Sequence, residues 1–457
     1  MLITLIVVLV VMANFLTSLN LVFGVFILAI MIASMVIGVV ITNPLYAVVA
    51  NLGSTFLLFF TFYRLLGITS IPLGFVLEGL NFLAVLVLVF KRQLKGFTTL
   101  FGYLLLLWLL VSFIELFNPF AASRVAWFHA IRQVINNIIP FFVIYSLFMH
   151  DRGTIKTLLK FWLFFCLLAA LYTFVQEFGG FPPWDYKFVT RSEESISLIY
   201  TWGRFRKISF FSGPMENGVI LAFNAVLCLG LAFQNNIKPS KKYTLLLLCG
   251  LSAWAMIYTG TRTATVMFVA GAAIYIVLSR SKELLVYTCI IAVLLVGYVA
   301  KTGGGAALHV MTTAFNPEED NSMQVRYDNQ KVLRGYLSKS PIGFGLGSTG
   351  YLGMKYSPNT FLGSFPPDSE LVRIVIETGV IGLAIWLVIF YLILSKSLDT
   401  LKVKEDDFSD NLNKVIFALL FMFLLGQYPQ QILNIGSLKI LLGFCMAHVC
   451  LMSKSEQ

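Results

Sequence analysis

The stretch Tyr258-Thr-Gly-Thr-Arg-Thr263 separates two apolar runs, residues 243–259 and 263–279. Each run approaches the roughly 20 mostly apolar residues that a helix needs to cross a bilayer. Gly260 permits a tight turn between the two runs, and the threonine hydroxyls can cap the second helix at its start. The stretch therefore predicts two membrane-spanning helices that meet at the water interface in a short turn carrying Arg262.

The composition of the whole chain agrees with this local pattern. Of the 457 residues, 58% are hydrophobic and 12% are charged, and the mean hydropathy is +0.85. A soluble domain has about twice that charged fraction. Such a chain has too little polar surface to cover itself, so lipid must cover part of it. The composition excludes a soluble protein and predicts an all-α polytopic membrane protein.

Apolar runs along the chain predict about 14 transmembrane helices, with about 12–14 as the range. We treat them as a single integral membrane domain, residues 1–457. The predicted spans are residues 2–18, 21–41, 45–65, 72–90, 98–117, 133–149, 157–177, 216–233, 243–259, 263–279, 283–300, 370–395, 411–427 and 432–452.

Positive charge predicts the orientation of these spans, because lysine and arginine concentrate in short cytoplasmic loops. With the N-terminus in the cytoplasm, all the short Lys-rich loops fall on the cytoplasmic side: 91–95, 152–156, 238–242, 280–282 and 396–404. An odd error in the number of spans would break this agreement. Both termini are therefore predicted to be cytoplasmic. Most of the +11 net charge is topological, so we expect no nucleic-acid partner.

The opposite side receives four segments, residues 118–132, 178–215, 259–262 and 301–369. The second and fourth are too long to be simple connections. We expect 178–215 to be an extracytoplasmic loop. We expect 301–369 to be a large extracytoplasmic loop with short helices, placed before the last three spanning helices.

Arginine on the outer side is unusual, because Lys and Arg normally concentrate in cytoplasmic loops, so these arginines need another explanation. A guanidinium group binds phosphate through a planar two-donor fork, and several together can stabilise a pyrophosphate leaving group. Arg262 adds its charge to a helix start that already favours an anion. The alternative is that each arginine pairs with a carboxylate, snorkels or faces water. The predicted pyrophosphate ligands are Arg204, Arg206, Arg262 and Arg326.

Two further motifs occupy the end of the large outer loop. Pro341-Ile-Gly-Phe-Gly-Leu-Gly347 has glycine at every second position. This spacing suits a backbone that closely approaches a ligand or another segment, and a flexible surface turn is the alternative. Asp368 and Glu370 then precede or begin a long apolar helix. They either cap that helix or accept a proton from a sugar hydroxyl, so they join Arg262 as the predicted catalytic residues.

Sugar-binding residues are predicted among the aromatic and polar side chains near the outer helix ends. Trp202 can stack on a sugar face, although tryptophan also marks membrane interfaces. Gln176 and Glu216 can hydrogen-bond sugar hydroxyls. No cluster of His, Cys and carboxylate side chains has metal-ligand spacing, so we expect no metal and no cofactor.

Four stretches together resemble the O-antigen ligase and polymerase superfamily, the Wzy/WaaL-type membrane glycosyltransferases. Thr259-Gly-Thr-Arg262 resembles the TGSR-like turn of that family. Arg326 followed by Pro341-Ile-Gly-Phe-Gly345 resembles its R…P…G.G segment. The stretch from Asp368 to Gly382 resembles its HN.yl..l.E.GliGl helix start, and Phe211-Ser-Gly-Pro214 resembles its F.eP..fg element.

The resemblance implies a metal-independent, inverting glycosyl transfer at the outer face of the bacterial inner membrane. The donor is a glycan on undecaprenyl pyrophosphate, and family arginines that match Arg204, Arg262 and Arg326 bind its pyrophosphate. Ligases of the family place a histidine before the last motif helix, where this chain has Asp368. This departure favours a polymerase over a ligase.

The sequence thus predicts an O-antigen or exopolysaccharide polymerase in the inner membrane, with its active site facing the periplasm or exterior. Its predicted partners are the undecaprenyl-pyrophosphate-linked glycan, membrane lipid and a chain-length regulator protein. One alternative is an O-antigen ligase that transfers glycan to lipid A-core. The other is a non-enzymatic transporter or flippase of lipid-linked sugars, which should place charged residues deep in its helices.

Overall fold

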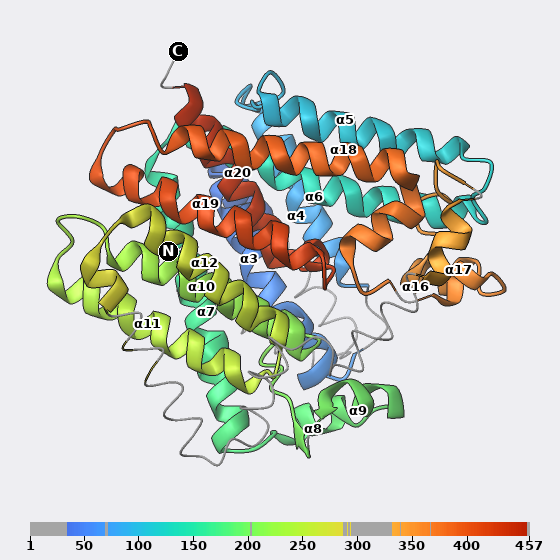
Figure 1. Cartoon of the computed structure of the whole chain (residues 1–457), viewed down its shortest axis with the longest axis horizontal. Coiled ribbons are helices and arrows are strands. Elements are labelled where there is room, and N and C mark those ends of the chain that lie inside the picture. The colour runs from blue at the N-terminus through green and yellow to red at the C-terminus, as the bar shows by residue number, and fades with distance from the viewer. Residues whose placement is uncertain are drawn as a thin grey trace.

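A computed structural model describes residues 34–68, 72–201, 203–286, 290, 293, 331–338, 340–365 and 367–454. These residues form an assembly of long helices, with one short two-stranded hairpin in the part of the chain that the structure describes (Figure 1). Predicted span 2–18 and most of 21–41 and 283–300 lie outside the described residues. Arg326 and Trp202 also lie outside them.

Nine helices in the described part are long and apolar enough to cross a membrane. This result confirms an all-helical, polytopic membrane protein, whereas the total of about 14 spans stays a prediction. The nine are α3 Leu45–Phe59 with η1 Phe60–Leu65, α5 Leu100–Ile114 with η2 Glu115–Phe117, α6 Arg124–His150, α7 Gly153–Phe178, α10 Pro214–Ala232, α12 Arg262–Ser279, α18 Glu370–Thr400, α19 Asp407–Gln427 and α20 Gly436–Lys454. The shorter helix α4 Gly74–Phe90 and the more polar helix α11 Pro239–Tyr258 occupy two further predicted spans.

Helix α6 begins well before its predicted span. Ser123 is the N-cap and accepts a hydrogen bond from the Ala126 amide at 3.3 Å, so the helix already includes Arg124 and Arg132. The predicted span 133–149 therefore starts too late, and the second half of the predicted outer segment 118–132 is helical. The interspersed polar residues end the apolar run but not the helix, and Arg132 forms an ion pair with Glu78 of α4 at 3.0 Å.

Helix α10 lies at the centre of the packing, and every residue from Asn217 to Ala232 is buried. It contacts α7, α11, α12 and α19. Glycines permit the close approach: a methyl group added at Gly230 would lie 2.2 Å from the Val415 side chain. Small residues are the usual means of packing helices tightly in a membrane. The N-terminus of α10 is consequently held in a fixed place at one end of the bundle.

Contacts between loops show which connecting segments lie at the same end of the bundle. Arg152 and Glu405, from two predicted cytoplasmic loops, form an ion pair at 2.7 Å. The amide of Lys207, in the predicted outer segment 178–215, donates to the carbonyl of Tyr258, next to the predicted outer turn 259–262, at 3.1 Å. This arrangement agrees with the charge pattern. Which end faces the cytoplasm stays a prediction.

The longer outer segments contain short elements of their own. Segment 178–215 contains α8 Pro183–Val189, α9 Glu193–Ile199 and the antiparallel strands β1 Tyr200–Thr201 and β2 Arg204–Phe205, in which Tyr200 pairs with Phe205 and Thr201 with Arg204. The described end of segment 301–369 contains α16 Gly350–Tyr356 and α17 Phe361–Ser364. In Figure 1, α8 and α9 lie at the lower right and α16 and α17 at the right.

Candidate functional site

The hairpin of β1 and β2 delivers a run of basic residues to the turn between α11 and α12. Arg206 donates from Nε to the Thr259 carbonyl at 2.8 Å and from Nη2 to the Thr261 hydroxyl at 3.0 Å. The Lys207 amide bonds to the Tyr258 carbonyl beside them. These bonds join segments more than 50 residues apart and fix Arg206 against the turn that carries Arg262.

The same turn packs against the first turn of α10. Gly260 has φ +61°, a conformation that glycine adopts without strain. The Thr261 hydroxyl donates to the Pro214 carbonyl at 3.0 Å, and a methyl group added at Gly218 would lie 2.6 Å from the Thr259 hydroxyl. Pro214 and Arg262 are the first residues of α10 and α12, so two helix N-termini meet here. Helix N-termini carry positive partial charge and favour anions.

We call the group of Arg204, Arg206, Lys207 and Arg262 the arginine turn, and among the described residues its positive charge exceeds the negative charge paired with it. Glu177 serves two of its members, with 3.2 Å to Lys207 and 3.9 Å to Arg204. Among the residues that the structure describes, no carboxylate forms an ion pair with Arg206. Burial and the neighbouring charge of Arg262 lower the pKa of Arg206 to about 10. The arginine turn therefore has the electrostatic character of an anion site.

The start of α18 holds a second charged group, the α18 cluster of Glu370, Arg373 and Glu377. Arg373 forms ion pairs with Glu370 and, at 3.2 Å, with Glu377. Both carboxylate residues are buried. Ser369 is the N-cap, accepting from the Val372 amide at 3.4 Å. Here one arginine is paired with two buried carboxylates inside the protein.

Asp368 precedes this N-cap directly and is exposed. Of the two carboxylates predicted from the sequence, Glu370 is therefore committed to an internal ion pair, whereas Asp368 faces outward. The N-cap of α18 is Ser369 and not Asp368.

The glycine run closely approaches another segment, a kink in α18 at Gly379. The amides of Gly345 and Gly347 donate to the backbone carbonyl and the side chain of Glu377 at 2.9 and 3.0 Å. A methyl group added at Gly343 would lie 2.4 Å from the Gly379 amide nitrogen. Gly343 and Gly379 have φ +81° and +70°. Of the two sequence-based interpretations, close approach is correct and the flexible surface turn is wrong, because these bonds fix the run against α18.

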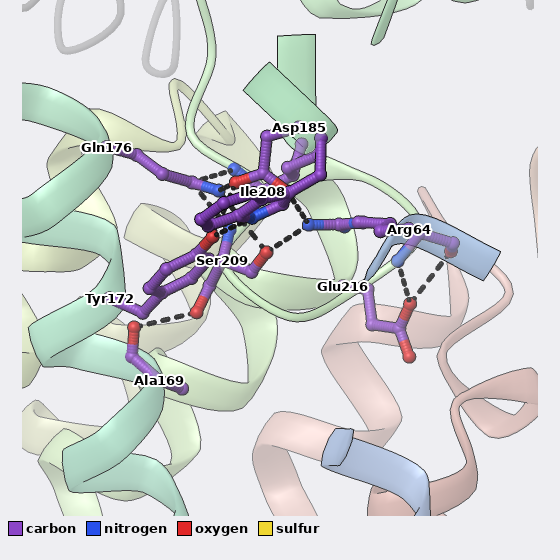
Figure 2. A network of polar contacts seen from close by, with 10 residues as sticks. Arg64, Ala169, Tyr172, Gln176, Asp185, Ile208, Ser209 and Glu216 are labelled. Carbon is purple, nitrogen blue, oxygen red and sulfur yellow. Dashed lines mark hydrogen bonds and ion pairs between the residues drawn. The ribbon is translucent and has the colours of Figure 1, made fainter. Parts of the chain in front are cut away.

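Gln176 lies in a buried network behind the arginine turn (Figure 2). Its side-chain nitrogen donates to Asp185 at 2.6 Å, and its oxygen accepts from the amides of Ile208 and Ser209 at 3.1 and 2.8 Å. Arg64 completes the network through a buried ion pair with Asp185 at 3.0 Å. The Gln176 amide thus anchors the loop that leads into α10, which supports a positioning role.

A cavity of about 420 Å³ opens beside the first turn of α10. Its walls come from α3, η1, the start of α4, residues 210–212 and Gly436. Among the described residues, Glu216 is the one acidic lining residue of the cavity, and its carboxylate accepts hydrogen bonds from the hydroxyl and amide of Ser212 at 2.9 and 3.3 Å. The remaining lining is apolar and aromatic, with the hydroxyl groups of Ser54, Thr55, Tyr63 and Ser212.

Comparison with known protein families identifies the part of the chain that contains the arginine-bearing turn, the glycine run and the start of α18. Residues 247–387 match the family model described as O-antigen ligase. This region is an O-antigen ligase family domain. A comparison of the chain with curated proteins found no match.

The matched region covers less than half of the 457-residue chain. The domain contains Arg262, Asp368 and Glu370, whereas Arg204, Arg206 and Glu216 reach the site from the preceding segment. The structure brings Arg206 and Arg262 together at one turn, and Arg204 shares Glu177 with Lys207 of the same group. It places Asp368 and Glu370 at the start of α18.

Sequence reasoning missed the buried pair of Arg64 and Asp185, which joins η1 to α8. The available signals were weak: a lone arginine near the end of an apolar run and an aspartate in a long outer loop. The pair is 121 residues apart in sequence, so spacing could not reveal it. In the described part of the chain, no group of three or more His, Cys, Asp or Glu residues is arranged to hold a metal ion.

Proposed function

We propose that this protein polymerises undecaprenyl-pyrophosphate-linked oligosaccharide repeat units into O-antigen or exopolysaccharide at the outer face of the inner membrane. The growing glycan is the donor, and the sugar at the end of an incoming lipid-linked repeat unit is the acceptor. The anomeric carbon inverts, and the lipid pyrophosphate leaves. The observation that carries this proposal is the arginine turn.

A pyrophosphate satisfies the arginine turn in three ways. It places negative charge between the guanidinium groups of Arg206 and Arg262. Burial and the charge of Arg262 both lower the pKa of Arg206, and a bound anion opposes this shift. It accepts from planar donor forks. It lies at the N-termini of α10 and α12, where backbone amides and the helix dipoles add further stabilisation. Charge that develops on the leaving oxygen during transfer is then stabilised by donors already in position.

The acceptor hydroxyl must lose a proton to a base during the transfer. Asp368 and Glu370 are the carboxylates proposed from the sequence for this role. The ion pair with Arg373 supports Asp368 over Glu370, because a carboxylate bonded to a guanidinium is a poor proton acceptor. The role of Asp368 requires its exposed side chain to reach the acceptor in the complex.

A ligase is the second candidate, and the description of the matching family model favours it. It uses the same donor and the same arginine turn, but its acceptor is lipid A-core. Asp368 in place of the family histidine supports the polymerase. The two functions therefore differ in the acceptor alone.

The test is the glycan pattern in a strain that lacks this protein, complemented with wild type or with Arg262→Ala. The polymerase predicts long chains with wild type and single repeat units with the variant at equal protein levels. Arg191→Ala is the matched control, because Arg191 is an exposed outer arginine that stacks on Phe188, with 4.1 Å from its guanidinium carbon to the ring centroid. Polymer that accumulates on the carrier lipid in the deletion strain contradicts the polymerase and identifies a ligase.

A further inference from the structure

The cavity and the arginine turn lie on opposite faces of the first turn of α10. Gly218 packs against Thr259 and Thr261 of the turn. Glu216, two residues earlier, lines the cavity. With 3.6 residues in each helical turn, two positions differ by about 200° around the helix axis. A sugar placed over the N-terminus of α10 would therefore have positive charge on one side and the Glu216 carboxylate on the other.

The cavity has the composition of a sugar-binding surface. The rings of Phe59 and Tyr63 stack at 4.9 Å between centroids and form one wall. Such rings can cover the apolar face of a sugar, and the hydroxyls of Ser54 and Ser212 can bond its polar edge. A site for a hydrocarbon chain alone would need neither the carboxylate nor these hydroxyls.

Arg64 adds a second sign that the cavity wall is built around polar chemistry. Its guanidinium carbon lies 5.9 Å from the ring centroid of Phe59, a lining residue of the cavity, and it interacts electrostatically with Glu216. The Arg64 side chain has no exposed surface, and its Nε and Nη2 have no hydrogen-bond partner among the described residues. A buried guanidinium is costly unless negative charge lies nearby, and Asp185, at 3.0 Å from Arg64, supplies that charge together with Glu216.

We propose that this cavity is the acceptor subsite and that Glu216 is the base that takes the proton from the attacking sugar hydroxyl. The inference rests on the proposed function, whose site it completes. The acceptor oxygen forms a bond to the anomeric carbon of the donor glycan. The bond from that carbon to the pyrophosphate oxygen breaks, and its electron pair leaves with the lipid pyrophosphate. The hydroxyl proton passes to the Glu216 carboxylate.

The position of Glu216 explains why inversion suits this site. An inverting displacement places the incoming oxygen and the leaving oxygen on opposite sides of the reacting carbon. The arginine turn holds the leaving group on one face of α10, and Glu216 receives the acceptor from the other face. This arrangement assigns the proton transfer to Glu216 in preference to Asp368.

The test uses purified full-length protein in detergent or nanodiscs, with a chemically defined lipid-linked repeat unit. Glu216→Gln keeps the size of the side chain, and we expect it to lower the transfer rate by about 100-fold or more, the usual contribution of a general base. Binding of undecaprenyl pyrophosphate should remain as in wild type. Glu193→Gln, an exposed outer carboxylate on α9, is the matched control and should transfer at the wild-type rate.

The pH profile gives a readout that a structural role would not produce. A base must be deprotonated to act, so the wild-type rate should fall as the pH falls through the titration of Glu216. Glu216→Asp should show the same fall in rate at low pH with a lower maximum rate, and the residual rate of Glu216→Gln should not show this fall. Ser54→Leu, which fills part of the cavity, should raise KM for the acceptor about 10-fold and leave binding of undecaprenyl pyrophosphate unchanged.

Transfer by Glu216→Gln at the wild-type rate overturns the proposal. Loss of transfer in Asp368→Asn together with normal transfer in Glu216→Gln also overturns it and places the base at the start of α18. A wild-type protein that forms no polymer but transfers glycan to lipid A-core contradicts the polymerase alone. In that case the Glu216 variants, assayed with lipid A-core, decide the role of this carboxylate in the same way.

Discussion

The arginine turn and the α18 cluster both contain arginine, but they differ in what surrounds its charge. Arg373 lies between Glu370 and Glu377 and is balanced by both. Arg206 lies beside another arginine, and its hydrogen bonds go to a carbonyl and a hydroxyl of the turn. The α18 cluster pairs its arginine with carboxylates of the protein, and we propose that the arginine turn is stabilised by a bound anion.

We interpret this difference as one between a structural cluster and a functional one. Placing like charges together costs free energy, and we propose that binding of the anionic substrate offsets this cost in the arginine turn. The α18 cluster instead holds the glycine run against the kink at Gly379 through Glu377. Changes in the α18 cluster should therefore act on stability, and changes in the arginine turn should act on substrate binding and turnover.

The largest effect is expected from Arg373→Ala, which leaves Glu370 and Glu377 buried without their partner. Breaking a buried ion pair by removing one member costs about 3–5 kcal/mol. We expect a marked loss of folded protein and a lower thermal midpoint in detergent, followed by intrinsic fluorescence. Lys402→Ala is the control, because Lys402 forms an exposed pair with Asp399 and should change the midpoint little. Equal midpoints for both variants would show that the α18 cluster is not structural.

Arg262→Ala should show the reverse pattern, with normal stability and lost activity. Removing one donor that stabilises developing negative charge costs about 10²–10³ in rate. The measurement is release of undecaprenyl pyrophosphate by purified protein, normalised to folded protein. Arg191→Ala should remain within about twofold of wild type. If Arg262→Ala lowers the thermal midpoint as much as Arg373→Ala does, the contrast between the two clusters is lost.

Gly343→Ala should destabilise the protein without touching any charged group. Its φ of +81° strains an L-residue, and its added methyl group would lie 2.4 Å from the Gly379 nitrogen. Such strain costs about 1–3 kcal/mol. Gly335→Ala is the matched control, because a methyl group there meets nothing within 4 Å. A thermal midpoint that falls equally in both variants would contradict the close packing of the glycine run.

The smallest effect is a shift of the thermal midpoint by inorganic pyrophosphate. At millimolar pyrophosphate we expect wild type to gain a few degrees, because a ligand that binds the folded state stabilises it by mass action. Arg206→Gln should abolish the gain, and Glu370→Gln should keep it. Arg206 is protonated below its pKa of about 10, so the gain should persist at pH 7–9 and decline as the pH rises past 10. A gain that survives in Arg206→Gln would remove Arg206 from the anion site.

Much of the helical framework could be predicted from hydropathy alone. The predicted span 45–65 coincides with α3 and η1, because an uninterrupted apolar run leaves the backbone little choice in lipid. The start of α6 was missed because Arg124 and Arg132 interrupt the apolar run, although backbone hydrogen bonding continues through them. Hydropathy measures contact with lipid and does not report where a helix extends into water.

The site was predictable in part for a similar reason. Arg204, Arg206 and Arg262 could be grouped from the sequence because all three were predicted on the same side of the membrane. The tight turn at Gly260 could be predicted from its glycine. The partner of the glycine run and the pairing of Arg64 with Asp185 depend on contacts between distant segments, which neither spacing nor charge pattern encodes. The cavity beside Glu216 is likewise assembled from α3, α4 and α20 and has no signature in any one of them.

The most direct test of the central claim is reconstitution of purified protein in nanodiscs with a lipid-linked repeat unit as the only glycan. The account predicts a ladder of products with one undecaprenyl pyrophosphate released for each repeat added, and no ladder with Arg262→Ala. A wild-type protein that leaves the single repeat unchanged until lipid A-core is supplied would contradict the polymerase. A ladder formed equally well by Arg262→Ala would contradict the assignment of the arginine turn as the pyrophosphate site.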